Sequence, residues 1–264
     1  MLGLPNTIHA LLFDLDGVLT QTAKVHGVAW KEMFDAFLRE RDGDTFTPFD
    51  PRRDYDTWVD GKPRLDGTRS FLASRGITLP EGTDDDPPGA ATVHGLSNAK
   101  NDLVLRLIHE RGVEVYDGSV RYVHAARAAG LPCAVVSSSA NCEDVLRAAG
   151  IHDLFDAIVD GVVAKRDGLA GKPAPDTFLA GAAALDTAPA NAAVFEDALA
   201  GVAAGRAGDF GYVVGVDRVG QADALRERGA DVVVADLDDL EAFDAGDGTR
   251  DKDGKNGEAG EGKA

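Results

Sequence analysis

The sequence predicts an α/β protein with a doubly wound parallel sheet and a helical cap domain inserted after the first strand. In the second half of the chain, short apolar runs such as residues 131–136 alternate with segments of helical periodicity. This alternation is typical of a parallel sheet that is covered by helices. A long and mostly helical stretch separates the first apolar run, at residues 10–13, from the others.

These patterns divide the chain into three parts. We expect a catalytic core made of residues 1–22 and 114–244, and a helical cap made of residues 23–113. Residues 245–264 contain no apolar residue larger than alanine, which predicts a disordered tail.

Composition restricts the classes of function. The chain has 264 residues, of which 44% are hydrophobic and 27% are charged, as in globular proteins with a sizeable core. Its formal net charge of −18 argues against nucleic acid as a partner, because the phosphate backbone attracts basic surfaces. Small phosphate esters are compatible with this charge, since a bound divalent cation can dominate the local field.

The sequence does not indicate secretion or membrane insertion. The N-terminal residues lack a basic region, and no apolar run approaches the roughly eighteen residues that a membrane helix needs. Cys133 and Cys142 fit neither a redox motif nor a zinc site, and we expect both to be small buried residues. The expectation is a cytoplasmic, monomeric enzyme without a membrane partner.

The most informative stretch is Asp14-Leu15-Asp16-Gly17, which directly follows the first apolar run. Side chains alternate along a strand, so Asp14 and Asp16 are expected on the same side, and Gly17 allows a sharp turn. The carboxyl end of a buried strand is where open parallel sheets bind ligands. Taken alone, the pair could also be two solvated acids at a strand end.

The predicted cap contains four candidate binding residues, which are His26, Trp30, Arg64 and Lys100. Residues 23–40 have the periodicity of a helix, which places His26 on or beside an apolar face with Trp30 one turn further on. By spacing alone, His26 could be a packed core histidine and Arg64 a surface charge. Lys100 is expected at the start of a helix, where a lysine is usually solvated.

Two further stretches of the cap are expected to be loops. Residues 41–56 and 80–91 are rich in Asp, Pro and Gly, which favour irregular structure. Between them, Phe71 and Leu72 belong to a predicted helix.

Three stretches in the second half of the chain add further polar residues. The strand at residues 131–136 is followed by four candidate anion-binding residues, Ser137, Ser138, Ser139 and Asn141. Hydroxyl and N–H groups at a strand-to-helix turn can bind an anion, although serines there could equally cap the helix. Lys172 follows a predicted loop and precedes Pro-Ala-Pro-Asp, and Glu196 and Asp197 lie at the end of another strand.

Together these motifs resemble the four-motif pattern of the haloacid dehalogenase-like phosphotransferases. The resemblance implies that Asp14 attacks phosphorus to form an aspartyl phosphate, and that Asp16 exchanges a proton with a sugar hydroxyl. It also implies that Ser137 binds the oxygens of the transferring group and that Lys172 offsets its charge.

The cap stretches resemble those of the β-phosphoglucomutase subfamily. This resemblance implies that His26 bonds the catalytic acid, and that Arg64 grips the phosphate that is not transferred, a task suited to a guanidinium fork. Trp30 and Lys100 would complete the binding side of the cap.

The resemblance implies a bound Mg²⁺. Its ligands would be Asp14, the main-chain carbonyl of Asp16, and Asp197, with Glu196 close by. The implied substrate is a small phosphorylated sugar, and the implied reaction interconverts β-glucose 1-phosphate and glucose 6-phosphate through glucose 1,6-bisphosphate.

A sugar-phosphate phosphatase is the alternative, because both activities use the same core and differ in how far the cap excludes water. A catalytically silent module is disfavoured, since the core motifs are complete. Three residues depart from the subfamily pattern: Gln21 stands where an acid is frequent, Ala140 where a lysine is common, and Ala198 where serine is frequent. These departures concern the choice of substrate rather than the chemistry.

Overall fold

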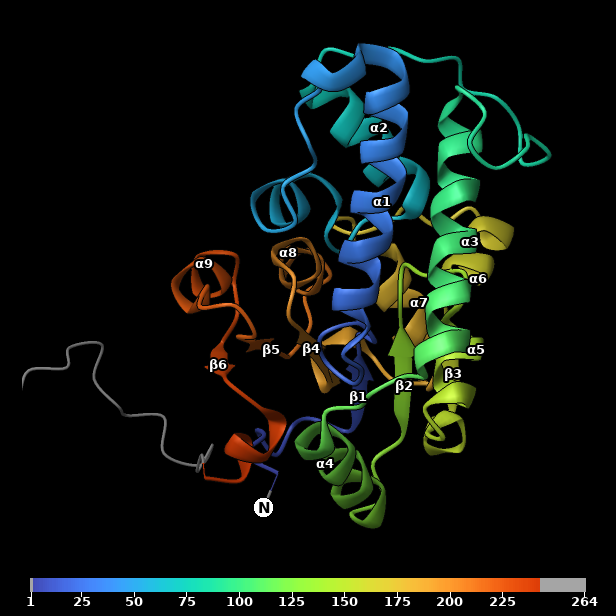
Figure 1. Cartoon of the computed structure of the whole chain (residues 1–264). Coiled ribbons are helices and arrows are strands. Elements are labelled where there is room, and N and C mark those ends of the chain that lie inside the picture. Colours follow the sequence, from blue (N-terminus) through green and yellow to red (C-terminus); the bar gives the residue numbers. More distant parts are fainter. Residues whose placement is uncertain (1, 243–264) are drawn as a thin grey trace, which may run out of the picture.

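A parallel sheet of six strands forms the centre of the computed structural model, which describes residues 2–242 (Figure 1). The strands are β1 (Ala10–Phe13), β2 (Cys133–Val136), β3 (Ala157–Val159), β4 (Ala192–Glu196), β5 (Tyr212–Val216) and β6 (Val232–Val234). Their order in the sheet is β3-β2-β1-β4-β5-β6, and all neighbours are parallel. The predicted fold class is confirmed, and the predicted tail at 245–264 lies outside the described residues.

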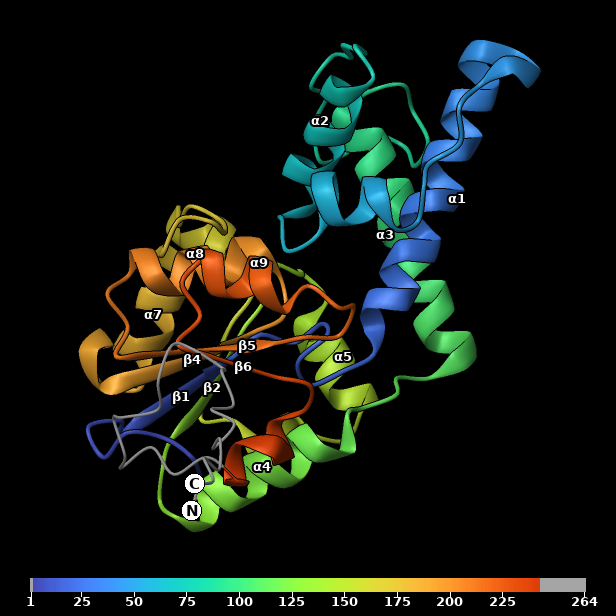
Figure 2. The ribbon, with the colours of Figure 1, turned by 90° about the vertical axis from the view of Figure 1, so that its left-hand side faces the viewer.

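Helices cover both faces of the sheet (Figure 2). On one face lie α7 (Asp176–Ala184), α8 (Leu199–Ala207) and α9 (Ala222–Glu227). On the other lie α4 (Asp117–Ala128), α5 (Cys142–Ala148) and a 3₁₀ turn at Leu237–Ala242. The central strands are therefore buried on both sides, which explains their continuous rather than alternating apolar sequence.

Three further helices form a second unit beyond the carboxyl ends of the strands. They are α1 (Thr22–Asp42), α2 (Arg64–Ser74) and α3 (Val93–Arg111), and we call residues 22–111 the helical insert. The two long helices α1 and α3 lie side by side (Figure 1), and α2 packs against α3. Within residues 2–242, no helix combines the length and apolar character needed to cross a membrane.

The helical insert has a hydrophobic core of its own, built largely from aromatic rings. Phe34 of α1 stacks on Trp30 with ring centroids 5.3 Å apart, and it contacts Phe71 of α2 at 4.0 Å. Phe49, from the connection between these helices, completes the group at 5.1 Å from Phe71. This cluster is distinct from the two clusters that flank the sheet.

The chain crosses between the core and the helical insert twice, at adjacent places. The Gln21 N–H donates to the Glu114 carbonyl at 2.8 Å, and the Tyr116 N–H donates to the Leu19 carbonyl at 2.9 Å. Both crossings lie where the sequence predicts a change from core to cap. That the two parts are separate domains stays a prediction.

Two helix predictions were wrong. Lys100 lies in the middle of α3 and not at its start, because Thr92 caps the helix by accepting a hydrogen bond from the Gly95 N–H at 2.9 Å. The stretch before Lys172, expected to be a loop, contains α6 (Gly161–Asp167). Asp160 caps that helix by accepting from the N–H groups of Val162 and Val163.

We predict that Phe71→Ala destabilises the protein by about 3–5 kcal/mol, because it leaves a cavity in the aromatic cluster of the insert. The matched control is Val28→Ala on α1, where the side chain is 37% exposed and the expected change is within about 0.5 kcal/mol. Urea unfolding curves give both values. Equal effects of the two substitutions would contradict a well-packed core in the insert.

Candidate active site

The carboxylates of Asp14 and Asp16 lie at the carboxyl end of β1, as predicted. The turn that follows needs glycine, because Gly17 has φ +87° and a Cβ atom there would lie 1.7 Å from Asp197 Oδ2. The hydroxyl of Thr22, the first residue of α1, donates a hydrogen bond to Asp16 Oδ1. The entry into the helical insert therefore holds the second carboxylate in place.

Lys172 is the buried cation beneath this pair. Its ammonium contacts Asp14, donates to Glu196 Oε1 at 2.7 Å and donates to the Val136 carbonyl at 3.1 Å. The Lys172 side chain is only 1% exposed. Burial alone would lower the pKa of Lys172, but the carboxylates of Asp14 and Glu196 raise it above its usual value, so the ammonium stays charged.

Three carboxylates at the ends of β1 and β4 could hold a metal ion. Oxygen atoms of Asp14, Glu196 and Asp197 all lie within 4.8 Å of one another. Burial, followed by the nearby carboxylates, raises the pKa of Asp197 well above its usual value. Burial also raises the pKa of Glu196, to about 7, against the opposing effect of Lys172. The single positive charge of Lys172 does not balance the negative charge of these three carboxylates. Their donor atoms are all oxygen, which is the kind of ligand that Mg²⁺ prefers.

The serine loop after β2 lies opposite these acids. Ser137 is buried, whereas Ser138 donates to the Gly61 carbonyl at 3.0 Å. Asn141 Nδ2 donates to Asn101 Oδ1 of α3 at 2.9 Å. Two of the four candidate anion-binding residues thus also connect the core to the helical insert.

His26 and Lys100 approach the carboxylate pair from the helical insert. Lys100 Nζ lies 2.9 Å from His26 Nδ1 and 4.9 Å from the centroid of the Trp30 ring. Burial lowers the pKa of His26 well below its usual value, so the ring is neutral. With Nδ1 accepting from Lys100, the ring proton is on Nε2, which lies 3.9 Å from Asp16 Oδ1. The hydrogen bond implied for His26 is therefore not formed in this conformation.

A single cavity of about 840 Å³ between the core and the helical insert collects most of the predicted site. Its lining includes eleven of the predicted residues: Asp14, Asp16, His26, Trp30, Arg64, Lys100, Ser137, Ser138, Ser139, Asn141 and Asp197. Lys172 and Glu196 are not among the lining residues and lie buried beside Asp14. Arg64 contributes a buried Nε atom that has no hydrogen-bond partner.

Sequence reasoning missed Asp60, which also lines the cavity. Burial, followed by repulsion from Glu196 and other nearby carboxylates, raises the pKa of Asp60 to about 7. Asp60 stands four residues before Arg64, and in that stretch the sequence pattern predicted a role only for Arg64. Its position opposite the acids of β4 depends on how the insert sits on the core.

Lys100 generates a prediction about stability. Burial lowers its pKa to about 7, against the opposing effect of Asp16. Above pH 7 the unfolded chain keeps this proton and the folded protein releases it, so the contribution of Lys100 to stability rises with pH. We expect the stability of wild type relative to Lys100→Met to increase by about 2 kcal/mol between pH 7 and pH 9.

Urea unfolding in EDTA at several pH values measures this difference. Replacement of the exposed Lys24 by Met is the matched control and should give no such trend. A difference between wild type and Lys100→Met that does not vary with pH would contradict a depressed pKa.

The comparisons with known proteins agree with this geometry. A family model described as haloacid dehalogenase-like hydrolase matches residues 8–209. A β-phosphoglucomutase of Mycobacterium bovis is 57% identical over 91% of this chain and 94% of its own. The Bacillus subtilis β-phosphoglucomutase is 33% identical over 88% and 91%.

Solved structures extend the same comparison. The crystal structure of β-phosphoglucomutase from Clostridium difficile matches with a TM-score of 0.71 and 26% identity, over 88% of this chain and 93% of that one. The family match, the identity to near full-length relatives and the shared architecture all agree. The chain therefore belongs to the haloacid dehalogenase-like hydrolase family and, within it, to the β-phosphoglucomutase subfamily.

Proposed function

We propose that this chain is a Mg²⁺-dependent phosphosugar mutase that interconverts β-glucose 1-phosphate and glucose 6-phosphate. The observation that carries the proposal is the enclosure of Asp14 and Asp16 beneath the helical insert, with Thr22 bonded to Asp16 and His26 close to it. The relatives named β-phosphoglucomutase at 57% identity support the same substrate.

Asp14 is the proposed nucleophile. In the first half-reaction, an oxygen of Asp14 bonds to phosphorus of glucose 1,6-bisphosphate while the bond from phosphorus to the sugar oxygen breaks, leaving an aspartyl phosphate. Lys172, which contacts the Asp14 carboxylate, offsets negative charge on the transferring group. Ser137 and the backbone N–H groups after it would bind the oxygens of that group.

Asp16 is the proposed general acid and base. It gives a proton to the departing sugar oxygen and takes one from the second hydroxyl when that hydroxyl attacks the aspartyl phosphate. Burial raises the pKa of Asp16, while the hydrogen bond from Thr22 lowers it. A raised pKa favours the protonated form of this carboxyl group, which is the form that a general acid needs.

The residues that would hold Mg²⁺ are Asp14, Asp197 and the main-chain carbonyl of Asp16, with Glu196 adjacent. When bound, the ion would neutralise charge on the phosphoryl oxygens. Glu196 accepts hydrogen bonds from Lys172 and from the Ala198 N–H, so its proposed task is to hold Lys172 beside Asp14.

Hydrolysis of a sugar phosphate is the second candidate, and the size of the cavity favours it. About 840 Å³ leaves room for water beside a hexose phosphate, within the range of ~300–1,000 Å³ typical of ligand sites. Water that reached the aspartyl phosphate would release inorganic phosphate instead of a second sugar phosphate.

³¹P NMR with Mg²⁺, β-glucose 1-phosphate and a trace of glucose 1,6-bisphosphate tests the proposal. We expect the glucose 6-phosphate signal to grow without inorganic phosphate, and Asp14→Asn to lose at least about 10³-fold in rate because the nucleophile is removed. The control is Asp144→Asn, an exposed acid of α5, which should retain wild-type turnover.

Each other outcome has a defined meaning. Inorganic phosphate as the main product would replace the mutase with the phosphatase. Substantial turnover by Asp14→Asn would rule out the aspartyl phosphate.

A further inference from the structure

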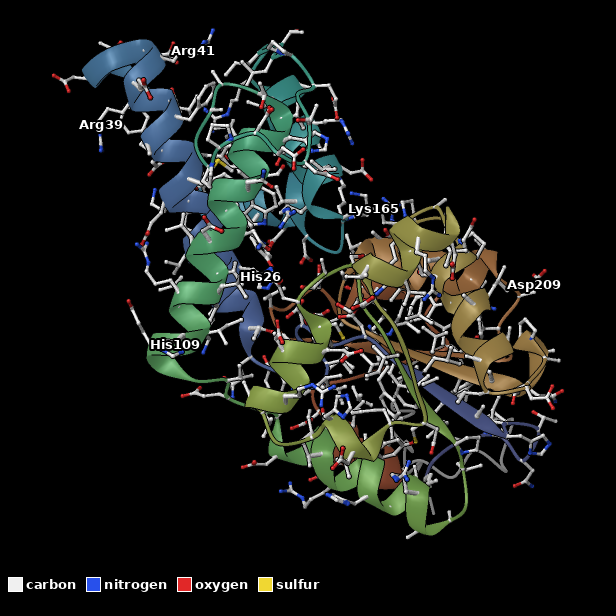
Figure 3. All side chains as sticks on the ribbon, turned by 90° about the vertical axis from the view of Figure 1, so that its right-hand side faces the viewer. His26, Arg39, Arg41, His109, Lys165 and Asp209 are labelled. Carbon is white, nitrogen blue, oxygen red and sulfur yellow. The ribbon has the colours of Figure 1, made fainter. Side chains whose placement is uncertain are left out.

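The cavity contains a second group of basic side chains, away from Lys172. Arg64 of α2, His94 of α3 and Lys165 of α6 all line it, and so does Asp84, from the loop before α3. The Asp84 carboxylate contacts Lys165 Nζ and lies 3.0 Å from His94 Nδ1. Figure 3 shows Lys165 where α6 faces the helical insert. A carboxylate of the chain itself therefore lies beside basic side chains at the exposed rim of the cavity.

Arg64 is less committed to partners within the chain than two lysines that line the same cavity. Lys62 donates to the Trp58 carbonyl at 3.0 Å and to Ser70 Oγ at 2.9 Å, and Lys100 contacts His26. Arg64, in contrast, has a buried Nε atom without a hydrogen-bond partner. A buried guanidinium N–H without a partner is costly, which indicates that an acceptor completes this place.

The electrostatic effects agree with this arrangement. The hydrogen bond from Lys165 and the charge of His94 lower the pKa of Asp84, although burial opposes them. Burial lowers the pKa of Arg64, and the charges of Asp84 and Asp102 oppose that effect. Asp84 thus interacts electrostatically with all three of these basic side chains.

The contact between Asp84 and Lys165 can open without moving the loop. Their side chains are 59% and 70% exposed, and such ion pairs are weak. The loop backbone is held separately, because Asn98 Nδ2 donates to the carbonyls of Asp84 and Asp86 at 3.1 and 2.9 Å. Rotation of two exposed side chains is enough to exchange the carboxylate for another anion.

We propose that Asp84 occupies the place of the substrate's second phosphate, the one that is not transferred, until substrate binds. Lys165 and His94 then join Arg64 in binding that phosphate once the Asp84 carboxylate turns away. The assignment of the anion to a sugar phosphate rests on the proposed function. Binding of a phosphate group to these three basic side chains does not depend on turnover.

Calorimetric titration with inorganic phosphate in EDTA tests the site directly. Without a divalent cation, the carboxylates around Asp14 repel phosphate, so binding reports on the cationic group. We expect Asp84→Asn to bind phosphate about threefold to fivefold more tightly than wild type, because it removes a competing exposed ion pair. The matched control is Asp85→Asn, the exposed neighbour in the same loop, which should bind like wild type.

The variant Lys165→Gln tests whether Lys165 itself binds phosphate. It should weaken phosphate binding about fivefold or more, and in Asp84→Asn/Lys165→Gln the gain from Asp84→Asn should shrink, because the two residues act as a pair. Equal affinities of wild type, Asp84→Asn and Asp85→Asn would overturn the proposal, as would an equal gain in both Asn variants.

The proposed mutase reaction and the proposed role of Asp84 can be contradicted independently of each other. Phosphate binding with these differences would stand even if NMR detected no mutase activity. Mutase activity with no response to Asp84→Asn would leave the reaction intact and remove Asp84 from it.

Discussion

Burial of several carboxylates at one edge of the sheet is the constraint on which the rest of the structure depends. Asp14 follows β1, and Glu196 and Asp197 lie at the end of β4, its neighbour in the sheet, so parallel pairing brings their oxygens within 4.8 Å. Water is largely excluded there, and each negative charge raises the pKa of the next. Lys172 offsets part of this charge, and a divalent cation fits the remainder.

The helical insert deepens that burial and supplies the opposite charge. Its own aromatic core allows it to cover the site as a packed unit, with Thr22, His26 and Lys100 directed at Asp16. The same desolvation acts in opposite directions on the two kinds of group. It raises the pKa of Asp16 and lowers those of His26 and Lys100, so burial disfavours the charged form of each of these groups.

The far side of the cavity shows a different balance. There the basic side chains of Arg64, His94 and Lys165 line the cavity, and Asp84 lies beside His94 and Lys165 at the solvent-exposed rim. The acids around Asp14 line the same cavity. Under the proposed function, these two groups of side chains would bind the two ends of a sugar bisphosphate.

The sequence by itself determined the sheet, its strand ends and the core of the site. Parallel strands carry their polar ends to one edge, so Asp14, Ser137 and Asp197 could be assigned to the same edge from the predicted parallel sheet alone. It also located the cap helices that carry His26 and Arg64, because amphipathic periodicity is a local property.

Only the tertiary structure decided how the cap meets the core. Asp60 lies opposite the acids of β4, and Asp84 contacts Lys165 across 81 positions of sequence, from a loop to a helix that was not predicted. Such contacts depend on loop paths and on the packing of the two units, and neither leaves a periodic pattern in the sequence. The residues at the strand ends can therefore be recognised in the sequence, whereas the contacts between the insert and the core are set only by the assembled fold.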